Sequence, residues 1–159
     1  MNPQEVIQFA REHGAKMVDF KFVDMPGTWQ HFSTPIRELE DETFVEGKPF
    51  DGSSVRAFQD INNTYQDLRS EMALLLEELG VRVETQHHKV GAPGQAKIDI
   101  RFNTLLQTAD NIMLYKYVMK NTERKHGKTA KFIPKSVFGD NGSGMHVHQS
   151  LWTRTPSKG

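Results

Sequence analysis

A turn near the middle of the sequence, Gly91-Ala92-Pro93-Gly94, constrains the fold more than any other feature. Residues 81–90 before it have the composition of a strand, and residues 95–102 after it alternate between apolar and polar side chains. The apolar members of this alternation are Ala96, Ile98, Ile100 and Phe102. Two strand-like runs joined by a four-residue loop predict a β-hairpin, so the sheet around residues 81–102 is expected to be antiparallel.

Two helices are predicted to back this hairpin, one on each side of it in the sequence. The helix over residues 66–79 carries apolar residues at helical spacing and ends at Gly80. Its predicted buried side consists of Leu68, Met72, Leu75, Leu76 and Leu79. The helix over residues 104–126 ends at Gly127, and its predicted buried side consists of Leu106, Ala109, Ile112, Met113 and Tyr117.

The segments at the two ends of the chain are predicted to add a smaller helix and further strands. Asn2 and Glu5 form a capping-box pattern around Pro3, which starts a helix that stops near Gly14. Strands are predicted over residues 18–22, 29–34, 129–134 and 145–152, with a turn at 25–28 and a glycine-rich loop at 135–144. Together with the hairpin and the two longer helices, these elements predict an α+β fold.

The composition argues against several classes of protein. The 159 residues include 20 basic and 20 acidic side chains, so no excess of positive charge points to nucleic acid or to an anionic membrane surface. No apolar run reaches the roughly 20 residues that a helix needs to span a bilayer. The absence of cysteine excludes disulfides and thiolate metal sites. We expect a cytoplasmic protein whose partners include neither nucleic acid nor membrane.

The motif with the clearest chemical content is Met145-His146-Val147-His148-Gln149-Ser150. In a strand, His146 and His148 share one face, and two imidazoles about 7 Å apart are suited to a metal or a phosphate. Two surface histidines beside a loop would have the same spacing. The preceding loop at 140–144 either exposes backbone N–H groups to an anion or is only a turn. The loop at 51–54 also has two interpretations, since it is either an acidic turn or a loop that offers a carboxylate to a cation.

Taken together, these motifs resemble the glutamine synthetase family of the class I bacterial type. The FDGSS loop and the PGTWQH turn resemble its N-terminal β-grasp domain, which predicts residues 1–63 as that domain. Residues 64–159 resemble part of its catalytic domain through QDLRSEM, QHH, GQAKIDIRF, YKYVMKN and KFIPKSVFGDNGSGMHVHQSLW. The resemblance implies the ATP-dependent ligation of ammonia to glutamate, with Mg²⁺ or Mn²⁺ as cofactor.

The resemblance also implies roles for individual residues. Asp51 matches an aspartate that helps bind ammonium, and Ser54 lies beside it in the same catalytic loop. His146 matches a metal ligand. Substrate glutamate is expected to contact Asn141 and Gly142. The residues that match nucleotide contacts are Glu84, Phe102, His148 and Ser150. Since the family builds each active site between neighbouring subunits of a ring, the resemblance further implies a homo-oligomer.

Two lysines depart from the family in a way that changes the chemistry. Lys89 and Lys97 stand where the family has metal-binding glutamates, so the local formal charge changes from −2 to +2. A lysine ammonium has no lone pair to give a cation, and a unit-charge contact at ~4 Å is worth about 4 kcal/mol at an effective dielectric constant of ~20. An ordinary exposed hairpin also carries lysines. In either case we expect neither side chain to bind a metal, and His146 alone cannot hold one.

The other departures from the family are missing segments and one further substitution. The paired glutamates of the EAEF type have no counterpart near residues 63–65, the family's C-terminal half is absent after Trp152, and Ser136 replaces a proline. These departures predict a chain that is inactive alone. Three hypotheses stay open: an active ligase, a non-catalytic module that binds a nucleotide, an anion or a subunit, and a degenerate fragment. Because strands are missing, we expect an unpaired sheet edge and association with a second copy, with full-length subunits or as aggregate.

Overall fold

The computed structural model describes residues 2–24, 27, 29–50, 65–89, 91–92 and 94–151. Its elements in chain order are α1 Pro3–Glu12, β1 Met17–Val23, β2 Trp29–Pro35, η1 Ile36–Glu38, α2 Asp41–Val45, α3 Gln66–Glu78, β3 Val83–His88, β4 Ala96–Ile100 and α4 Leu105–Lys125. This mixture confirms the α+β class. Asp51 and Ser54 lie outside the described residues, and so does the predicted domain boundary at 63/64.

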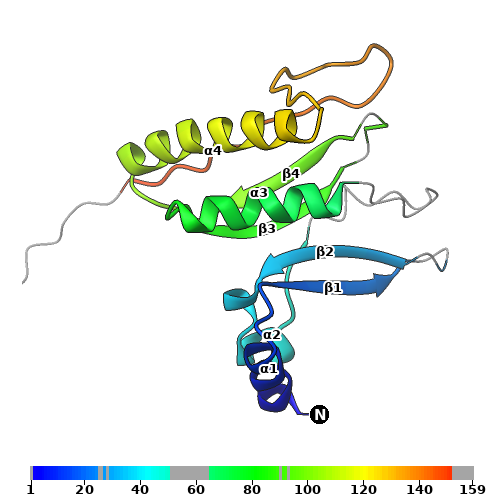
Figure 1. Cartoon of the computed structure of the whole chain (residues 1–159), viewed down its shortest axis with the longest axis vertical. Helices are drawn as coiled ribbons and strands as arrows, with labels where there is room; N and C mark the ends of the chain where they lie inside the picture. The colour runs from blue at the N-terminus through cyan, green and yellow to red at the C-terminus, as the bar shows by residue number, and fades with distance from the viewer. Residues whose placement is uncertain are drawn as a thin grey trace, which may run out of the picture.

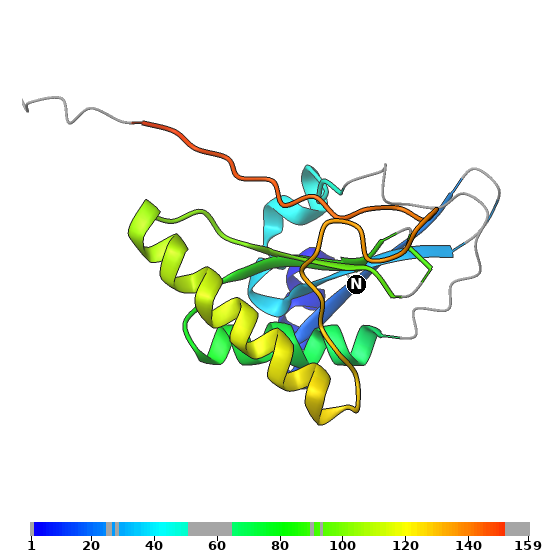
Figure 2. The same ribbon diagram turned by 90° about the horizontal axis from the view of Figure 1, so that it is seen from above.

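The strands form one antiparallel sheet in the order β1-β2-β3-β4. The predicted hairpin over residues 81–102 is confirmed by β3 and β4, in which His87 lies opposite Lys97. The predicted strands at 18–22 and 29–34 are confirmed by β1 and β2. α3 and α4 lie on the same side of this sheet, whereas α1 and α2 lie together at its β1 end (Figures 1 and 2).

The first helix begins as its sequence predicts. Asn2 Oδ1 accepts a hydrogen bond from the Glu5 backbone N–H at 2.9 Å, and the Glu5 carboxylate accepts one from the Asn2 backbone N–H at 2.9 Å. This reciprocal pair satisfies two N–H groups that a helix start leaves without partners. Gly14 follows the helix with a φ of +64°, a left-handed conformation that favours glycine.

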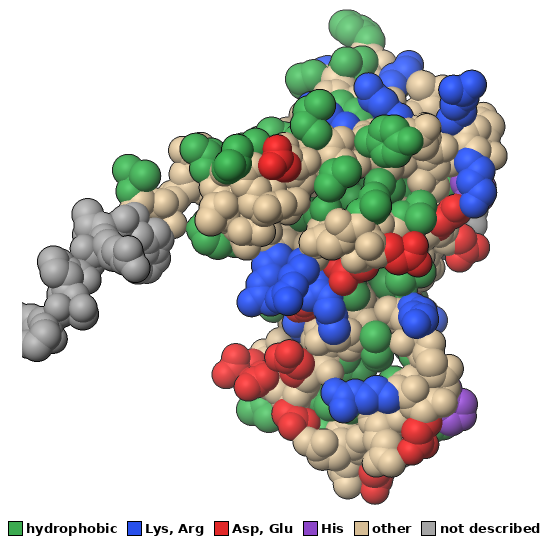
Figure 3. All heavy atoms as spheres, turned by 60° about the vertical axis from the view of Figure 1, so that its left-hand side comes forward, with side chains coloured by type: hydrophobic (Ala, Val, Ile, Leu, Met, Phe, Trp, Pro, Cys, Tyr) green, Lys and Arg blue, Asp and Glu red, His purple; other side chains and the backbone are tan. Residues whose placement is uncertain are grey.

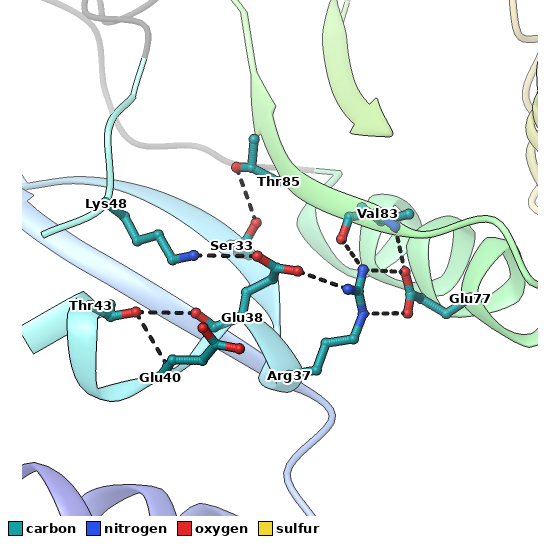
Figure 4. A network of polar contacts seen from close by, with 9 residues as sticks. All are labelled: Ser33, Arg37, Glu38, Glu40, Thr43, Lys48, Glu77, Val83 and Thr85. Carbon is teal, nitrogen blue, oxygen red and sulfur yellow. Dashed lines mark hydrogen bonds and ion pairs between the residues drawn. The ribbon is translucent and has the colours of Figure 1, made fainter. Parts of the chain in front are cut away.

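Polar contacts join the segment after β2 to α3 and β3 (Figure 4). Arg37 donates to the two oxygens of the Glu77 carboxylate at 2.8 and 2.9 Å, and to the Val83 carbonyl oxygen at 2.6 Å. Glu77 also accepts a hydrogen bond from the Val83 backbone N–H. Because Arg37 lies in η1 and Glu77 in α3, this network holds the N-terminal strands against the rest of the chain.

The core lies between the sheet and the two longer helices. Nine buried apolar residues form its central cluster: Leu68, Met72, Ala73, Leu76, Val81, Val83, Ile98, Val118 and Met119. The predicted buried side of α3 is largely confirmed, although Leu79 at its end is 51% exposed. Within the described residues, no helix is both long and apolar enough to cross a membrane.

The predicted buried side of α4 is wrong. Leu106 is 75% exposed, Met113 70% and Tyr117 67%, and Ala109 is also exposed. The residues of α4 that the fold buries are Asn111, Val118, Met119 and Thr122. Apolar side chains occur all round this helix, so periodicity alone did not indicate which side would face the sheet. The side that carries Val118 and Met119 packs on α3 and β4 and leaves the opposite side in solvent.

Two predicted strands are also absent from the described residues. Residues 129–134 have no strand pairing, and residues 145–151 are extended and exposed without a neighbouring strand. A strand requires a partner for its backbone N–H and C=O groups, and the described sheet ends at β4. The predicted unpaired edge is therefore present at β4, but the segment at 145–151 does not pair with it.

Candidate functional site

The glycine-rich loop at 139–144 is held against the turn of the β3–β4 hairpin. Asp140 Oδ2 accepts a hydrogen bond from the Ala92 backbone N–H at 2.9 Å. Gln95 Nε2 donates to the Gly142 carbonyl oxygen at 2.9 Å and to Ser143 Oγ at 2.8 Å. Two segments almost fifty residues apart in the sequence therefore meet at one place.

Two glycines near this contact each allow another part of the chain to approach closely. A Cβ at position 142 would lie 2.9 Å from the Pro134 carbonyl oxygen, a distance that real Cβ atoms essentially never show. A Cβ at position 94 would lie 2.6 Å from the Tyr65 ring, and Gly94 has a φ of +97°. Both positions therefore require glycine for steric reasons, and Gly94 requires it for its backbone conformation as well.

A cleft of about 440 Å³ opens beside this loop, between α3, α4, the hairpin turn and the segment at 128–143. Asn141, one of the predicted substrate-binding residues, lines it together with Asp140 and Ser143. Tyr65 lines it as well, with the Lys128 ammonium 5.0 Å from the centre of its ring. The cleft thus combines an aromatic surface, polar loop groups and charges of both signs.

Two ionisable side chains in the cleft wall are buried enough to shift their pKa values. Burial lowers the pKa of Arg69 to about 10, and its Nε donates to Gln86 Oε1 at 2.6 Å. Burial also raises the pKa of Tyr115 to about 12, with a further contribution from the negative charge of Asp99. At neutral pH Arg69 is therefore cationic and Tyr115 is neutral.

Lys89 and Lys97 lie near each other around His87. Lys97 is directly opposite His87 in the β3–β4 register. Lys89 lies two residues after His87, just beyond the end of β3, and two residues along a strand is the spacing of side chains on one face. Burial lowers the pKa of His87, and both lysine charges lower it further. Lys97 Nζ forms an ion pair with Asp99 at 3.1 Å. This face of the hairpin therefore carries two ammonium groups and one carboxylate that is already paired.

This donor set does not fit a divalent cation. Ammonium groups offer no lone pair, and hard cations such as Mg²⁺ prefer several carboxylate or carbonyl oxygens. Asp99 supplies the carboxylate of this face, and its charge is compensated by Lys97. Among the described residues there is also no group of three or more His, Asp or Glu side chains that could hold a metal ion.

The other described residues that were predicted for the site are not among those that line the cleft. Glu84 is exposed on β3; the pKa of Arg37 is raised mainly by its hydrogen bond with Glu77, and the charge of Glu84 adds to this. Phe102 is 71% exposed just after β4. His146, His148 and Ser150 are exposed on the extended segment and are not among the residues that line the cleft. Gly142 contributes its carbonyl oxygen to the contact with Gln95.

Sequence reasoning did not identify Gln95 and Tyr65 as parts of this site. Gln95 anchors the glycine-rich loop through two hydrogen bonds, and Tyr65 forms one wall of the cleft. The position of Gln95 directly after the hairpin turn was the one available signal, since a side chain there can reach a loop that packs on the turn. Nothing in the sequence around Tyr65 indicated a role.

The chain matches the model of the glutamine synthetase catalytic domain over residues 15–157. The match begins inside the segment expected to form a β-grasp domain, and the division at 63/64 stays a prediction. The chain is 29% identical to a glutamine synthetase of Frankia alni, with 94% of this chain and 58% of that protein covered. It therefore spans little more than half of that relative's length.

The Frankia alni alignment extends over 273 positions, although the chain has only 159 residues. That relative therefore has more than a hundred residues inside the matched span that have no counterpart here. A glutamine synthetase of Streptomyces coelicolor is 61% identical over 89 residues, which are 56% of this chain and 19% of that protein.

A protein named 3-hydroxylaminophenol mutase, from Cupriavidus pinatubonensis, is 58% identical over 90 residues, which are 57% of this chain and 19% of that protein. Relatives with two different named activities thus match similar lengths of this chain at similar identity, so a match of this length does not by itself indicate which reaction occurs. The catalytic-domain match, in contrast, covers nearly all of the sequence. The chain belongs to the glutamine synthetase family.

Proposed function

We propose that this chain is a partial glutamine synthetase unit that does not ligate ammonia to glutamate by itself. The observation that carries the proposal is the hairpin face around His87, where Lys89 and the ion pair of Lys97 with Asp99 stand. The family reaction transfers a phosphoryl group, and divalent cations neutralise the charge that develops on its oxygens. A face with two ammonium groups repels such a cation.

The proposal keeps the family's substrates, ATP, glutamate and ammonia, as those of the complete enzyme. Asn141 and Gly142 remain our candidates for contacts to glutamate, which is consistent with the position of Asn141 in the cleft wall. His146 is exposed on the extended segment, apart from the cleft, so the proposal gives it no metal in this chain. A cytoplasmic location and assembly with other subunits are parts of the same proposal.

The direct test measures ligation and metal binding on the purified chain. We expect no glutamine above the enzyme-free blank with ATP, glutamate, ammonia and Mg²⁺, and no γ-glutamyl transferase activity with Mn²⁺. We also expect the electron paramagnetic resonance signal of free Mn²⁺ to stay unchanged when the protein is added. Turnover by the chain alone, or ordered Mn²⁺ at the hairpin, would overturn the proposal.

A double variant tests the physical cause. Lys89→Glu with Lys97→Glu returns two carboxylates to the hairpin face and reverses its charge, so this variant is expected to bind Mn²⁺ where the parent does not. Lys16→Glu with Lys21→Glu is the matched control, because it makes the same charge change at two exposed positions outside the hairpin. Equal Mn²⁺ binding by both variants would show that net charge, and not the hairpin face, controls the metal.

A second function is favoured by the same two lysines. Ammonium groups bind phosphate as point charges, and the described residues offer Lys89 no ion-pair partner comparable to Asp99. We infer that the chain retains weak nucleotide binding that needs no metal. Isothermal titration with ATP should give the same affinity with and without Mg²⁺, and Lys89→Gln should weaken it at least several-fold. Binding that requires Mg²⁺ would contradict this second function.

A further inference from the structure

The glycine-rich loop contains a residue pair with a chemistry of its own, Asn141 followed by Gly142. It is the only asparagine–glycine pair in the sequence. Asn141 is exposed and lines the cleft. Asparagine is among the chemically labile residues of proteins, because the backbone nitrogen of the next residue can attack its side-chain carbonyl carbon. Glycine hinders that attack least, since it has no Cβ beside the nitrogen.

The hydrogen bonds of the loop leave both of these groups without a partner among the described residues. The backbone N–H of Asn141 donates to Asp140 Oδ1 at 2.7 Å, and that of Ser143 donates to the Pro134 carbonyl oxygen at 2.6 Å. Between them, the backbone N–H of Gly142 has no acceptor in the part of the chain that the structure describes, and the side-chain amide of Asn141 has no partner there. The nitrogen and the carbon are therefore both free to react.

Two other exposed asparagines differ from Asn141 in this respect. Asn103 Oδ1 accepts a hydrogen bond at 2.8 Å from the backbone N–H of Thr104, which is the nitrogen that would have to attack. Asn121 lies inside α4, and its Nδ2 donates to the Tyr117 carbonyl oxygen at 2.8 Å. Both asparagines are followed by threonine, which is branched at Cβ and crowds its own backbone nitrogen.

We propose that Asn141 is a site of spontaneous deamidation. In the first step the Gly142 nitrogen loses its proton to a base of the solvent and forms a bond to Asn141 Cγ. The bond from Cγ to Nδ2 then breaks, and the nitrogen leaves as ammonia after taking up a proton from water. The product is a cyclic succinimide. Water adds to one of its two carbonyl carbons and opens the ring, which gives either aspartate or isoaspartate. Neither step changes an oxidation state.

The contacts of the loop set the rate of this reaction. The backbone between Asn141 and Gly142 has to rotate before the nitrogen reaches Cγ. The loop is fixed before this point by the contact of Asp140 with the hairpin turn, and after it by Gln95, whose Nε2 donates to the Gly142 carbonyl oxygen at 2.9 Å. The attack therefore takes place in molecules whose loop has opened locally. Because Gln95 holds the loop closed, it protects Asn141.

Deamidation adds a charge to the cleft. The side-chain amide of Asn141 becomes a carboxylate, so a chain of zero formal net charge gains one negative charge. The new carboxylate stands beside Asp140, in a wall that also contains Lys128 and Lys131. Basic side chains are visible at the top of the molecule, where the segment after α4 lies (Figure 3). Since the added charge meets charges of both signs, we expect its electrostatic effect on the loop to be small.

The isoaspartate product has the larger structural effect. It places the former side-chain carbon in the main chain, which becomes one carbon longer between Asn141 and Gly142. The Gly142 carbonyl oxygen and Ser143 Oγ then no longer have the spacing at which the amide of Gln95 reaches both. The modified loop therefore stays open, and the change is irreversible. This consequence holds whether or not the cleft binds glutamate.

Peptide mapping by mass spectrometry tests the site on the full chain. After incubation in mildly alkaline buffer, the mass change of deamidation should accumulate at Asn141 before it appears at Asn103 or Asn121. Gln95→Ala should raise the rate at Asn141 at least about threefold, because the loop opens more often. Gln8→Ala, which removes an exposed contact within α1, is the matched control and should leave the rate unchanged.

The unfolded chain supplies the reference rate. Circular dichroism establishes that both variants fold, and the parent chain in urea gives the rate at Asn141 without the fold. The folded parent should react more slowly than the unfolded chain, with Gln95→Ala between the two. An Asn141 that stays intact while the unfolded chain is modified, or that reacts no faster than Asn103, would overturn the site. Equal rates in the parent and in Gln95→Ala would overturn the protective role of Gln95.

Hydrogen exchange tests the opening of the modified loop. The deamidated chains are isolated by ion exchange through their added charge, and Asn141→Asp carries the same charge without the longer main chain. The deamidated sample should contain a population whose Ser143 backbone N–H exchanges several-fold faster than in the parent, whereas Asn141→Asp should stay close to the parent. Equal exchange in all three samples would overturn the opening of the loop. An equally fast Asn141→Asp would do so for its cause, because charge and not main-chain length would then be responsible.

Discussion

α3 and α4 back the same sheet, and both were predicted to bury one apolar side, but only α3 buries the predicted side. In α3 the predicted residues Met72 and Leu76 are 3% and 0% exposed. In α4 the predicted residues Leu106 and Met113 are 75% and 70% exposed. The two helices differ in how sharply the polar residues define a solvent side. α3 has its acidic residues opposite the predicted face, whereas α4 has apolar residues all round.

The difference shows that an apolar stripe locates a contact surface without indicating what lies on it. In α3 the partner of the stripe is the sheet of the same chain. In α4 the side with Val118 and Met119 packs on the sheet and α3, whereas the predicted apolar stripe with Leu106 and Met113 is exposed. The periodicity of α4 is therefore consistent with a helix that has two contact surfaces, of which the described part of this chain covers one.

The largest expected effect is on the free energy of unfolding when one leucine of each apolar stripe is shortened to alanine. Leu76→Ala removes a fully buried side chain of α3, so the free energy of unfolding should fall by about 2–5 kcal/mol. Leu106→Ala is the matched change in α4 and should alter it by less than about 0.5 kcal/mol, because the side chain is in solvent. Urea denaturation at low protein concentration measures both values. Similar losses for the two variants would mean that α4 packs by the side carrying Leu106.

The same comparison shows how much the sequence predicts. The hairpin was predictable because a glycine turn indicates which strands pair, but the observed register, with His87 opposite Lys97, differs by one residue from the one that a four-residue loop at 91–94 gives. Helix existence was predictable from periodicity and from Gly80 and Gly127 as stops. The side of α4 that is buried was not, since it depends on which neighbours the whole fold supplies.

The candidate site was also predictable only in part. The glycine-rich loop was recognisable as a loop, and its contact with the hairpin turn through Gln95 depends on side-chain hydrogen bonds across 47 and 48 residues of sequence. Such long-range contacts leave no local pattern. The predicted strand at 145–152 failed for a related reason, because a strand forms only where another strand offers its edge.

A smaller effect is expected at the junction between the N-terminal strands and α3. Glu77→Gln keeps the shape of the side chain but replaces a charge-assisted pair with Arg37 by a neutral one, in a place where the Glu77 side chain is 22% exposed. The free energy of unfolding should fall by about 1–3 kcal/mol at pH 7. Arg101→Gln, at an exposed position after β4, should leave it within about 0.5 kcal/mol.

The pH dependence of that loss is a separate test of the junction. Burial raises the pKa of Glu77, but the hydrogen bonds from Arg37 and Val83 and the nearby arginine charges outweigh it, so the pKa is lowered. A lowered folded-state pKa means that the stabilisation is complete above the unfolded pKa and disappears as the pH falls through the folded one. The stability difference between parent and Glu77→Gln should therefore narrow in acid. A difference that stays constant with pH would show that the carboxylate charge is not responsible.

An effect of about 1 kcal/mol is expected where the glycine-rich loop meets the hairpin. Gln95→Ala removes the hydrogen bonds to Gly142 and Ser143, so the loop should open more often while the core of α3 stays unchanged. Hydrogen exchange of the Ser143 backbone N–H, which donates to the Pro134 carbonyl oxygen at 2.6 Å, should accelerate several-fold. Gln8→Ala, which removes an exposed contact within α1, is the control and should leave that exchange rate unchanged.

The smallest effect concerns the point where α3 itself contacts the end of α4. Glu71 accepts hydrogen bonds from Lys125 and His126 at 2.6 Å each, and the bond from Lys125, followed by that from His126, lowers the pKa of Glu71. The Lys125 side chain is 69% exposed, so salt screens this contact and its effect on global stability should be near the limit of detection. Glu71→Gln should instead increase fraying at the C-terminal end of α4, seen as faster amide exchange there at low salt. Glu78→Gln, at an exposed position of α3, should not change this exchange rate. An equal response from both variants would mean that the contact of Glu71 with Lys125 and His126 does not hold the two helices together.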